Sequence, residues 1–329
     1  MGRIANVYFA IEMPGSVAEN RCNVGETHEE PQSAAATMRP QSAMGIRVLL
    51  YRLDEVAAAM SAASAKTDLE PLVLLRVANG TAHLTLNRPG QYNALSEQML
   101  AALHSSLEGL AADPSVRVVV LGGAGKAFCA GHDLKQMKAN PRLDYYERLF
   151  DECSRLMMRI QTLPQPVIAR VHGIATAAGC QLVAMCDLAV AAADARFAVS
   201  GVNLGLFCAT PSVALTRNVG RKAAFEMLMT GEFISAATAM ERGLINRAVA
   251  ADRLDQEIQV LAASIAAKPA LAVSTGKALF YRQLELGIAP AYQLAGQAMA
   301  CNMMDDIAQE GVCAFLEKRT ANWSTKTSA

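Results

Sequence analysis

The stretch that decides the fold is GIATAAGCQ, residues 173–181. It follows an apolar β-type run at Pro166–Val171 and leads into a helical segment at Gly179–Met185. Small residues fill this junction, so a ligand can approach the main chain closely. The first turn of a helix also has backbone N–H groups without intrahelical partners. The junction therefore predicts a place where main-chain donors could hold an anion or a polarised oxygen.

A second junction of the same kind is FCAGHDLK, residues 128–135. A buried strand at Val116–Leu121 and a glycine-rich turn precede it, and a helix is expected around Tyr145–Ile160. If both junctions face one carbonyl oxygen, their N–H groups would stabilise the oxyanion that forms there, and losing one donor costs about 10²–10³ in rate. Taken singly, such a loop is more often a close-packing device, so the function depends on the pair.

Upstream of these junctions the sequence predicts a hairpin and a helix. Leu72–Val77 and Thr81–Leu86 are short β-type runs around the turn dipeptide Asn79-Gly80. Apolar residues at helical spacing follow from Ser96 to Ala111, and Ser96 is suited to the helix N-cap. Strand-strand-helix units therefore recur along the chain.

Downstream, Leu188–Ala191 and Arg196–Val199 are predicted strands, and the sequence from Arg221 onward appears almost wholly helical in its pattern. The expected fold class is α/β, a series of strand-strand-helix units followed by helices. Three parts are predicted: a poorly ordered extension at 1–70, a core at 71–260 and a C-terminal helical region at 261–329.

Composition narrows the class of function. The 329 residues are 52% hydrophobic with a formal net charge of zero, which is typical of a compact soluble protein and offers no basic footprint for nucleic acid. The longest uncharged stretch, Phe197–Thr216, contains Asn203 and Pro211, so we interpret it as strand and loop. We expect no nucleic-acid partner and no membrane insertion.

The eight cysteines are scattered, and several, such as Cys180 and Cys186, lie in apolar surroundings, so reduced buried thiols are expected. No CxxC pair occurs and the five histidines do not cluster, so no metal is predicted. Met1–Pro14 lacks a basic region feeding a hydrophobic run, which argues against a secretory signal. The expected compartment is the cytoplasm, with the mitochondrial matrix as the alternative in a eukaryote.

Several segments, in the order in which they follow one another along the chain, resemble the enoyl-CoA hydratase/isomerase (crotonase) superfamily. The resemblance covers roughly Leu72 to Trp323. It rests on Asn87-Arg88-Pro89 with Asn93-Ala94-Leu95, on residues 128–135, on Gly179 with Met185-Cys186-Asp187, and on Glu310-Gly311, residues 314–319 and Trp323. It implies a spiral of strand-strand-helix units with a C-terminal helical trimerisation region. It also implies an acyl-CoA thioester as ligand, a homotrimer or dimer of trimers, and no cofactor beyond the coenzyme A of the substrate.

The resemblance also implies roles for single residues. The main-chain N–H groups of His132 and Ala178 would form the oxyanion hole, and Gly131 and Gly179 would keep the two loops open. Contacts to the CoA are expected from Asp133, Leu134 and Lys135 in the first loop, and from Lys277 and Tyr281 in a C-terminal helix.

Two positions depart from a hydratase of this family. Gln181 and Gly201 stand where such enzymes carry the two glutamates around the added water. An amide does not titrate near neutrality and cannot be a general base, although Gln181 could position water or substrate. Efficient hydration is therefore doubtful. The alternatives are an isomerase, decarboxylase or thioesterase, or a catalytically silent acyl-CoA-binding or regulatory protein.

Three side chains are candidate substitutes for the missing acid-base groups. The His132 imidazole could lie near the acyl group, although the family uses the backbone of this residue. Cys208 could reach the pocket, and a buried inert thiol is the competing interpretation. Asp133 could be a base or could cap the helix that begins there.

Overall fold

The computed structural model describes residues 70–323, which belong to the compact unit Asp68–Ala329. The predicted extension at 1–70 lies outside the described residues except for its last position. The strands are β1 Val73–Ala78, β2 Thr81–Leu86, β3 Val118–Gly123, β4 Ala127–Cys129, β5 Val167–Val171, β6 Ile174–Thr176, β7 Leu188–Ala192, β8 Arg196–Ala198, β9 Ile234–Ser235 and β10 Arg247–Val249. The helices are α2 Glu97–Ala111, α3 Leu134–Ala139, α4 Leu143–Thr162, α5 Ala178–Met185, α6 Ala209–Asn218, α7 Arg221–Thr230, α8 Ala236–Glu241, α9 Leu254–Ala266, α10 Ala270–Leu284, α11 Ile288–Met303 and α12 Asp306–Leu316, with short 3-10 turns at Pro89–Gln91, Ser200–Leu204 and Ala251–Arg253.

The predicted hairpin is confirmed. Strands β1 and β2 pair antiparallel with Ala78 opposite Thr81, so the loop is Asn79-Gly80 alone. Both loop residues have positive φ, 50° at Asn79 and 72° at Gly80. Two consecutive positive φ values make the tight turn whose twist matches the flanking strands, and Asn-Gly is the dipeptide that adopts it at least cost.

Two sheets receive alternate strands, which confirms the expected strand-strand-helix units. The larger sheet has the order β1-β2-β3-β5-β7-β10, and the smaller has the order β4-β6-β8-β9. From β2 onward the larger sheet is parallel, and β4, β6 and β8 are parallel in the smaller sheet. From β3 to β8 each turn of the chain thus adds one strand to each sheet, and the turns β3–β4 and β5–β6 are followed by the helices α4 and α5.

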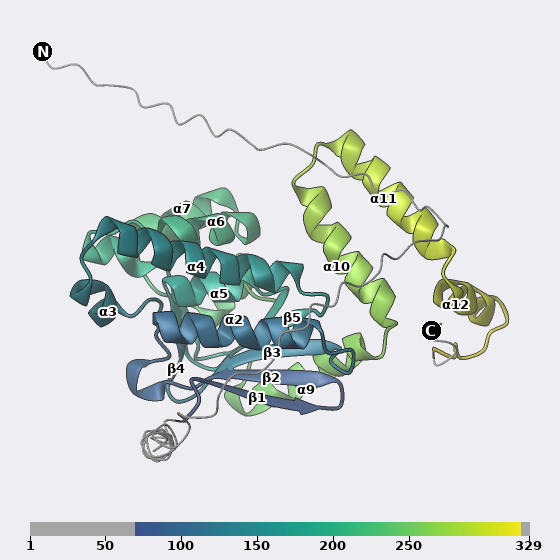
Figure 1. Ribbon diagram of the computed structural model, residues 1–329, viewed down its shortest axis with the longest axis horizontal. Coiled ribbons are helices and arrows are strands. Elements are labelled where there is room, and N and C mark those ends of the chain that lie inside the picture. Colours follow the sequence, from purple (N-terminus) through teal and green to yellow (C-terminus); the bar gives the residue numbers. More distant parts are fainter. Residues whose placement is uncertain (1–69, 324–329) are drawn as a thin grey trace, which may run out of the picture. The chain divides into compact units, whose positions relative to one another are not determined.

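Both faces of the larger sheet are buried. Along β3, Val118 and Val120 point to α9, where they meet Leu254 and Ile258. The alternate residues of β3 belong to the main core on the other side, with the apolar faces of α2 and α4. Figure 1 shows α9 below the sheet and α2, α4 and α5 above it. A parallel sheet covered on both faces has continuous apolar strands, which is why its strands show no alternation in the sequence.

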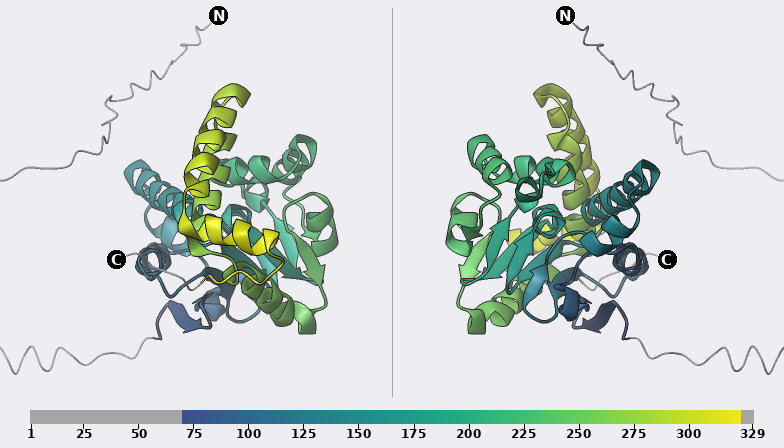
Figure 2. Two further views of the ribbon diagram at one scale, coloured as in Figure 1. Left: turned by 90° about the vertical axis from the view of Figure 1, so that its right-hand side faces the viewer. Right: turned by 90° about the vertical axis from the view of Figure 1, so that its left-hand side faces the viewer.

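The helices α10, α11 and α12 extend from the layered core, and both views of Figure 2 show α11 standing well clear of it. The predicted boundary at 260/261 falls inside α9, which packs on the sheet, so the helices that leave the core begin at Ala270. No single helix within residues 70–323 is long and apolar enough to cross a membrane. The segment Ala251–Ala266 passes only when joined to Ala270–Leu284, from which it is bent by 103°.

Two expectations for the second half of the chain need a correction in detail. The region after Arg221 is almost wholly helical as expected, but it also contains β9 and β10, which add to the edges of the two sheets. They contain two and three residues, too few for a periodic signal. The stretch Phe197–Thr216 is also not all strand and loop, because its last part lies in α6.

Candidate active site

The two junctions singled out in the sequence lie against each other. A Cβ added to Gly131 would lie 2.9 Å from the Cβ of Ala177 and 3.2 Å from the Ala178 nitrogen. A Cβ added to Gly179 would lie 2.1 Å from the carbonyl oxygen of Cys129. A side chain at either position would collide with the other loop, so the two glycines allow the main chains to approach each other closely. The expected role of Gly131 and Gly179 in keeping the loops open to a ligand stays a prediction.

Asn93 holds the first loop in place. Its side chain is fully buried, and Nδ2 donates to the carbonyl oxygens of Ala124, Ala127 and Phe128 at 2.9, 2.8 and 3.1 Å. Its Oδ1 accepts from the Arg88 N–H at 2.9 Å. One amide thus satisfies four main-chain groups around the loop. The sequence indicated that Asn93 belongs to a family motif, but only the structure shows the hydrogen bonds by which it holds the first loop.

The N–H groups of His132 and Ala178 have no hydrogen-bond partner in the described part of the chain. The backbone on either side of His132 is fixed, because the Leu95 N–H donates to Gly131 O and the Asp133 N–H donates to Leu95 O. Ala178 is the first residue of α5, where an unpaired N–H is inherent to the helix. Ala177, just before it, has φ 51° and ψ −122°, an unusual conformation for alanine that turns the chain into the helix.

Beside these donors lies a cavity of about 280 Å³. Among the described residues, its lining includes no aspartate, glutamate, lysine or arginine. The lining residues are Ala130, His132, Leu134, Met137, Phe150, Ala177, Ala178, Ser200, Gly201, Leu204, Leu206, Phe207, Cys208, Ala209, Thr210 and Pro211. An apolar pocket with few polar groups suits an uncharged organic chain.

The His132 side chain lines this cavity and packs edge-on against Phe150, with ring centroids 5.4 Å apart. Neither ring nitrogen has a hydrogen-bond partner among residues 70–323, and both are closed off from solvent. Burial lowers the pKa of the imidazole to about 4 against the opposing effect of the nearby Leu95 backbone, so the ring is neutral at physiological pH.

The two positions that depart from a hydratase have different surroundings. Gln181 is buried on α5 and does not line the cavity, and its Oε1 has no partner within the described residues. Gly201 does line it, but a Cβ there would lie 2.4 Å from Leu206 O and 2.6 Å from Cys208 Sγ. The Gly201 N–H donates to that sulfur at 3.3 Å. Cys208 thus reaches the pocket as the sequence suggested, and burial raises the pKa of its thiol, which favours the inert form.

The first-loop residues expected to contact CoA do different things. Asp133 caps α3 by accepting from the N–H groups of Lys135 and Gln136, and it pairs with Arg88 at 2.7 Å. Burial opposes ionisation, but the Arg88 and backbone hydrogen bonds outweigh it and lower the pKa of Asp133, so the group is a poor base at neutral pH. Leu134 lines the cavity, whereas the exposed Lys135 does not.

Lys277 and Tyr281 were expected at the nucleotide, but the structure engages them in the protein interior. Lys277 is 8% exposed, and its Nζ donates to Asp187 Oδ2 at 2.7 Å and to the carbonyls of Ile160 and Gln165. The Tyr281 hydroxyl donates to Asp187 Oδ1 at 2.7 Å. Burial lowers the pKa of Lys277 against the opposing pull of Asp187, and it raises the pKa of Tyr281. The three residues therefore fasten α10 to the core.

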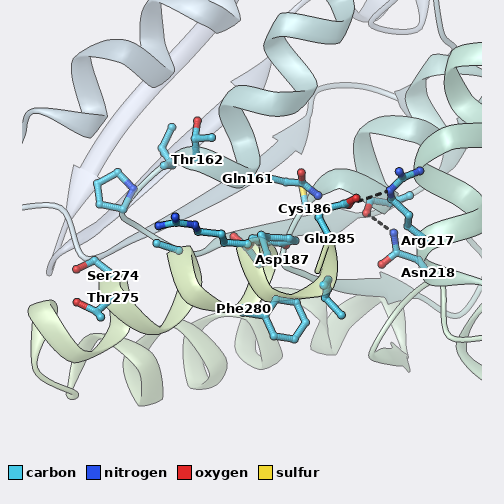
Figure 3. A pocket seen from close by; sticks show the side chains of 17 residues that line it. Gln161, Thr162, Cys186, Asp187, Arg217, Asn218, Ser274, Thr275, Phe280 and Glu285 are labelled. Carbon is cyan, nitrogen blue, oxygen red and sulfur yellow. Dashed lines mark hydrogen bonds and ion pairs between the residues drawn. The ribbon is translucent and has the colours of Figure 1, made fainter. Parts of the chain in front are cut away.

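Asp187 and Tyr281 also border a second cavity, of about 1030 Å³, between α10 and the core. Figure 3 shows its walls, with Ser274 and Thr275 at one end of the cavity and Arg217 and Asn218 at the other end, beside Glu285. This cavity shares no lining residue with the first. Neither cavity offers a metal centre, since residues 70–323 contain no group of three or more His, Cys, Asp or Glu side chains that could hold an ion.

The buried cysteines match the expectation of reduced thiols. Cys129, Cys153, Cys180 and Cys186 are free and buried, and burial raises the pKa of Cys180 to about 12. Such thiols are structural apolar groups and not nucleophiles.

Two parallel-strand sheets wound as a spiral, with two touching loops beside an apolar pocket, define a crotonase-fold protein. The family model described as enoyl-CoA hydratase/isomerase matches residues 76–326, and the chain belongs to that family. A crystal structure of enoyl-CoA hydratase from Mycobacterium smegmatis is 65% identical, covers 78% of this chain and all of that one, and has a TM-score of 0.77.

Human enoyl-CoA hydratase domain-containing protein 3, also a crystal structure, is 44% identical with a TM-score of 0.75, covering 77% of this chain and all of that one. A relative from Xenopus laevis, named enoyl-CoA hydratase domain-containing protein 3, mitochondrial, is 44% identical over 254 residues, which are 77% of this chain and 86% of the relative. The stretches 175–184 and 201–208 of the sequence indicate the same relative.

Proposed function

We propose that this protein binds an acyl-CoA thioester and polarises its carbonyl with the main-chain N–H groups of His132 and Ala178. The supporting observation is that these two unpaired donors come from loops in direct contact, beside an uncharged pocket of about 280 Å³. The pocket would take the acyl chain, and the donors would stabilise negative charge that develops on the thioester oxygen. No cofactor beyond the CoA of the substrate is needed for this chemistry.

The reaction we favour is one of enoyl-CoA or a related acyl-CoA in fatty-acid metabolism, but not efficient hydration by the two-glutamate route. Such hydration requires proton transfer at two carbons, and positioned acid-base groups contribute about 10²–10⁴-fold. The Gln181 amide cannot transfer a proton, and at Gly201 the space for a side chain is taken by Leu206 O and Cys208 Sγ. Isomerisation, decarboxylation or thioester hydrolysis on the same polarised carbonyl remain the alternatives.

A second candidate function is acyl-CoA binding without turnover, in a regulatory role. It is favoured by the charge-free pocket lining, which presents no carboxylate, and by a histidine that stays neutral at physiological pH. The retained pair of donors favours an enzyme. Donors that interact most strongly with the negative charge of a transition state accelerate a reaction, whereas they add less to the binding of the ground state.

The test is a panel of saturated, enoyl- and 3-oxoacyl-CoAs presented to the full chain, with binding measured by thermal shift and turnover by mass spectrometry. Ala178→Pro deletes one donor at the first helical position. Because Ala177 has φ 51° and ψ −122°, outside the extended region that a residue before proline prefers, circular dichroism must show that the variant is folded. We expect it to reduce turnover by about 10²–10³. The matched control is Ala177→Gly, which relieves the positive φ next door and keeps the N–H.

Binding without turnover would favour the regulatory candidate. Wild-type protein that binds no acyl-CoA would refute both candidates. If the folded Ala178→Pro protein turns over substrate at the wild-type rate, the proposed role of this donor is wrong.

We further propose that the helices beyond Ala270 mediate a homotrimer or a dimer of trimers. Large apolar side chains on α11 and α12, including Ile288, Met299 and Phe315, are 71–83% exposed in the single chain, which supports burial against another copy. Sedimentation velocity would test this. As for the compartment, the relative from Xenopus laevis is named as mitochondrial, which supports the mitochondrial alternative and not the expected cytoplasm.

A further inference from the structure

The imidazole of His132 is a buried polar group of the acyl pocket that the proposed function leaves unexplained. In that function the residue acts through its backbone N–H, yet its ring also lines the cavity. A neutral imidazole has one donor and one acceptor nitrogen. Buried polar groups in native proteins nearly always have partners, so a ring with neither nitrogen paired points to a missing partner.

Two other polar side chains around the cavity, those of Ser200 and Cys208, differ from His132 in this respect, whereas the third, Thr210, is only half-buried. The Ser200 hydroxyl pairs with the Thr176 hydroxyl at 2.9 Å. The Cys208 sulfur accepts from the Gly201 N–H. These groups are already engaged within the protein, whereas the ring of His132 is available to a ligand.

The ring nitrogens can be brought to the pocket without rebuilding the loop. The rotation of histidine about Cβ–Cγ is soft and roughly two-fold, and a half turn exchanges each nitrogen with a carbon of similar size. Phe150 packs on the ring edge-on and Met137 lines the same cavity, and the one backbone group that acts on the imidazole, that of Leu95, is not held in a hydrogen bond of good geometry.

We propose, on the basis of the acyl-CoA-binding function above, that the His132 imidazole selects acyl groups that carry a neutral hydroxyl or oxo oxygen close to the thioester. The ring and the backbone N–H belong to the same residue, so an oxygen within a few bonds of the thioester carbon lies within reach of the ring. His132 is then a specificity-determining residue through its side chain, separate from the donor role of its main chain.

The charge of the pocket fixes the chemical class of this substituent. The lining carries no charged side chain, and burial keeps the imidazole neutral. An acyl carboxylate would therefore be buried without a counter-charge, which is strongly unfavourable. An unsubstituted alkyl chain would leave both ring nitrogens unpaired, which costs affinity relative to a chain that pairs with one of them.

The experiment compares butyryl-CoA, 3-hydroxybutyryl-CoA and 3-oxobutyryl-CoA, which have the same chain length, by calorimetric titration of the full chain. We expect the wild type to bind the oxygen-bearing ligands about 5- to 100-fold more tightly than butyryl-CoA. In His132→Phe the ratio of affinities for the oxygen-bearing ligands and for butyryl-CoA should fall to about 1, whatever the absolute affinity of the variant for butyryl-CoA. His132→Asn, which restores a neutral donor and acceptor, should recover part of the preference.

The preference should also stay constant from about pH 6 to about pH 8, because the ring does not titrate there. A preference that is unchanged in His132→Phe would overturn the inference, as would a wild type that binds all three ligands equally. A wild type that binds none of the three would instead refute the proposed function itself, so the two failures are distinguishable. Circular dichroism of both variants checks that each is folded.

Discussion

The atoms around Gly201 leave no space for a side chain at this position. Leu206 O and Cys208 Sγ occupy the directions in which a side chain at this position would grow. Its φ is not in the left-handed region, so the constraint is steric and does not come from backbone conformation. Replacing Gly201 by glutamate would therefore not restore a hydratase site, because the carboxylate has no room.

Gly201→Ala should destabilise the protein by about 1–3 kcal/mol through overpacking. The matched control is Gly109→Ala, exposed in the last turn of α2 with nothing within 4 Å of the added carbon. The control should stabilise by about 0.5–1 kcal/mol. Urea unfolding of the two variants measures both effects. A Gly201→Ala protein as stable as the control would contradict the packing described here.

The low pKa of His132 predicts an acid-sensitive stability term. The folded-state pKa is about 4 and the ordinary value is 6.5, so between these values the unfolded chain binds a proton that the folded chain does not. Stability must then fall as pH drops through this window. His132→Phe lacks this term, so its free energy of unfolding relative to that of the wild type should rise by roughly 2–3 kcal/mol between pH 6.5 and pH 4. Denaturant titrations at several pH values would reveal it, and a constant difference would disprove it.

At the residue scale, the sequence could predict the small-residue loops and the two departures from a hydratase, because those features are local. It could not predict that Gly131 and Gly179 bring the loops together, since their close contacts lie in distant segments. The same holds for Lys277. Its ion pair joins residues 90 positions apart, so an exposed CoA contact and a buried anchor are indistinguishable in the sequence.

At the scale of elements, the ends of the helices follow from local chemistry. Ser96 caps α2 by accepting from the Met99 N–H, as expected, and Asp133 caps α3. The hairpin at Asn79-Gly80 was predictable for the same reason. The strands β9 and β10 were not, because two- and three-residue strands exist only through their pairing with β8 and β7.

Ser96→Ala should cost about 1 kcal/mol, because the Met99 N–H is buried with the cap and loses its acceptor. Ser105→Ala, on the exposed side of the same helix, is the control and should be neutral or slightly stabilising. Thermal unfolding followed by circular dichroism compares the two. Equal melting temperatures would show that the cap does not contribute.

At the scale of the whole molecule, one buried ion pair holds α10 against the layered core. The Lys277 ammonium meets Asp187 and two main-chain carbonyls, so the charge is fully paired although it is buried. The larger cavity in Figure 3 opens beside this anchor. The sequence predicted a helical C-terminal region, but not how it is attached.

Lys277→Ala should lower the free energy of unfolding by about 3–5 kcal/mol, because Asp187 remains buried with its counter-charge removed. Arg282→Ala, on the exposed side of the same helix, should change it by at most about 0.5 kcal/mol. Chemical denaturation gives both values, and limited proteolysis reports whether α10 detaches first. A Lys277→Ala protein with wild-type stability would show that the helix is held by other contacts.

The contact between the two loops has a consequence for motion. The Gly179 backbone packs against the Cys129 carbonyl, and the Gly131 backbone packs against Ala177. A displacement of either loop must therefore move the other loop as well. The gap between the His132 and Ala178 nitrogens should then fluctuate less than the absolute position of either one. Thermal motion would move the two nitrogens together, so the distance between them stays nearly constant for a ligand while the surrounding helices fluctuate.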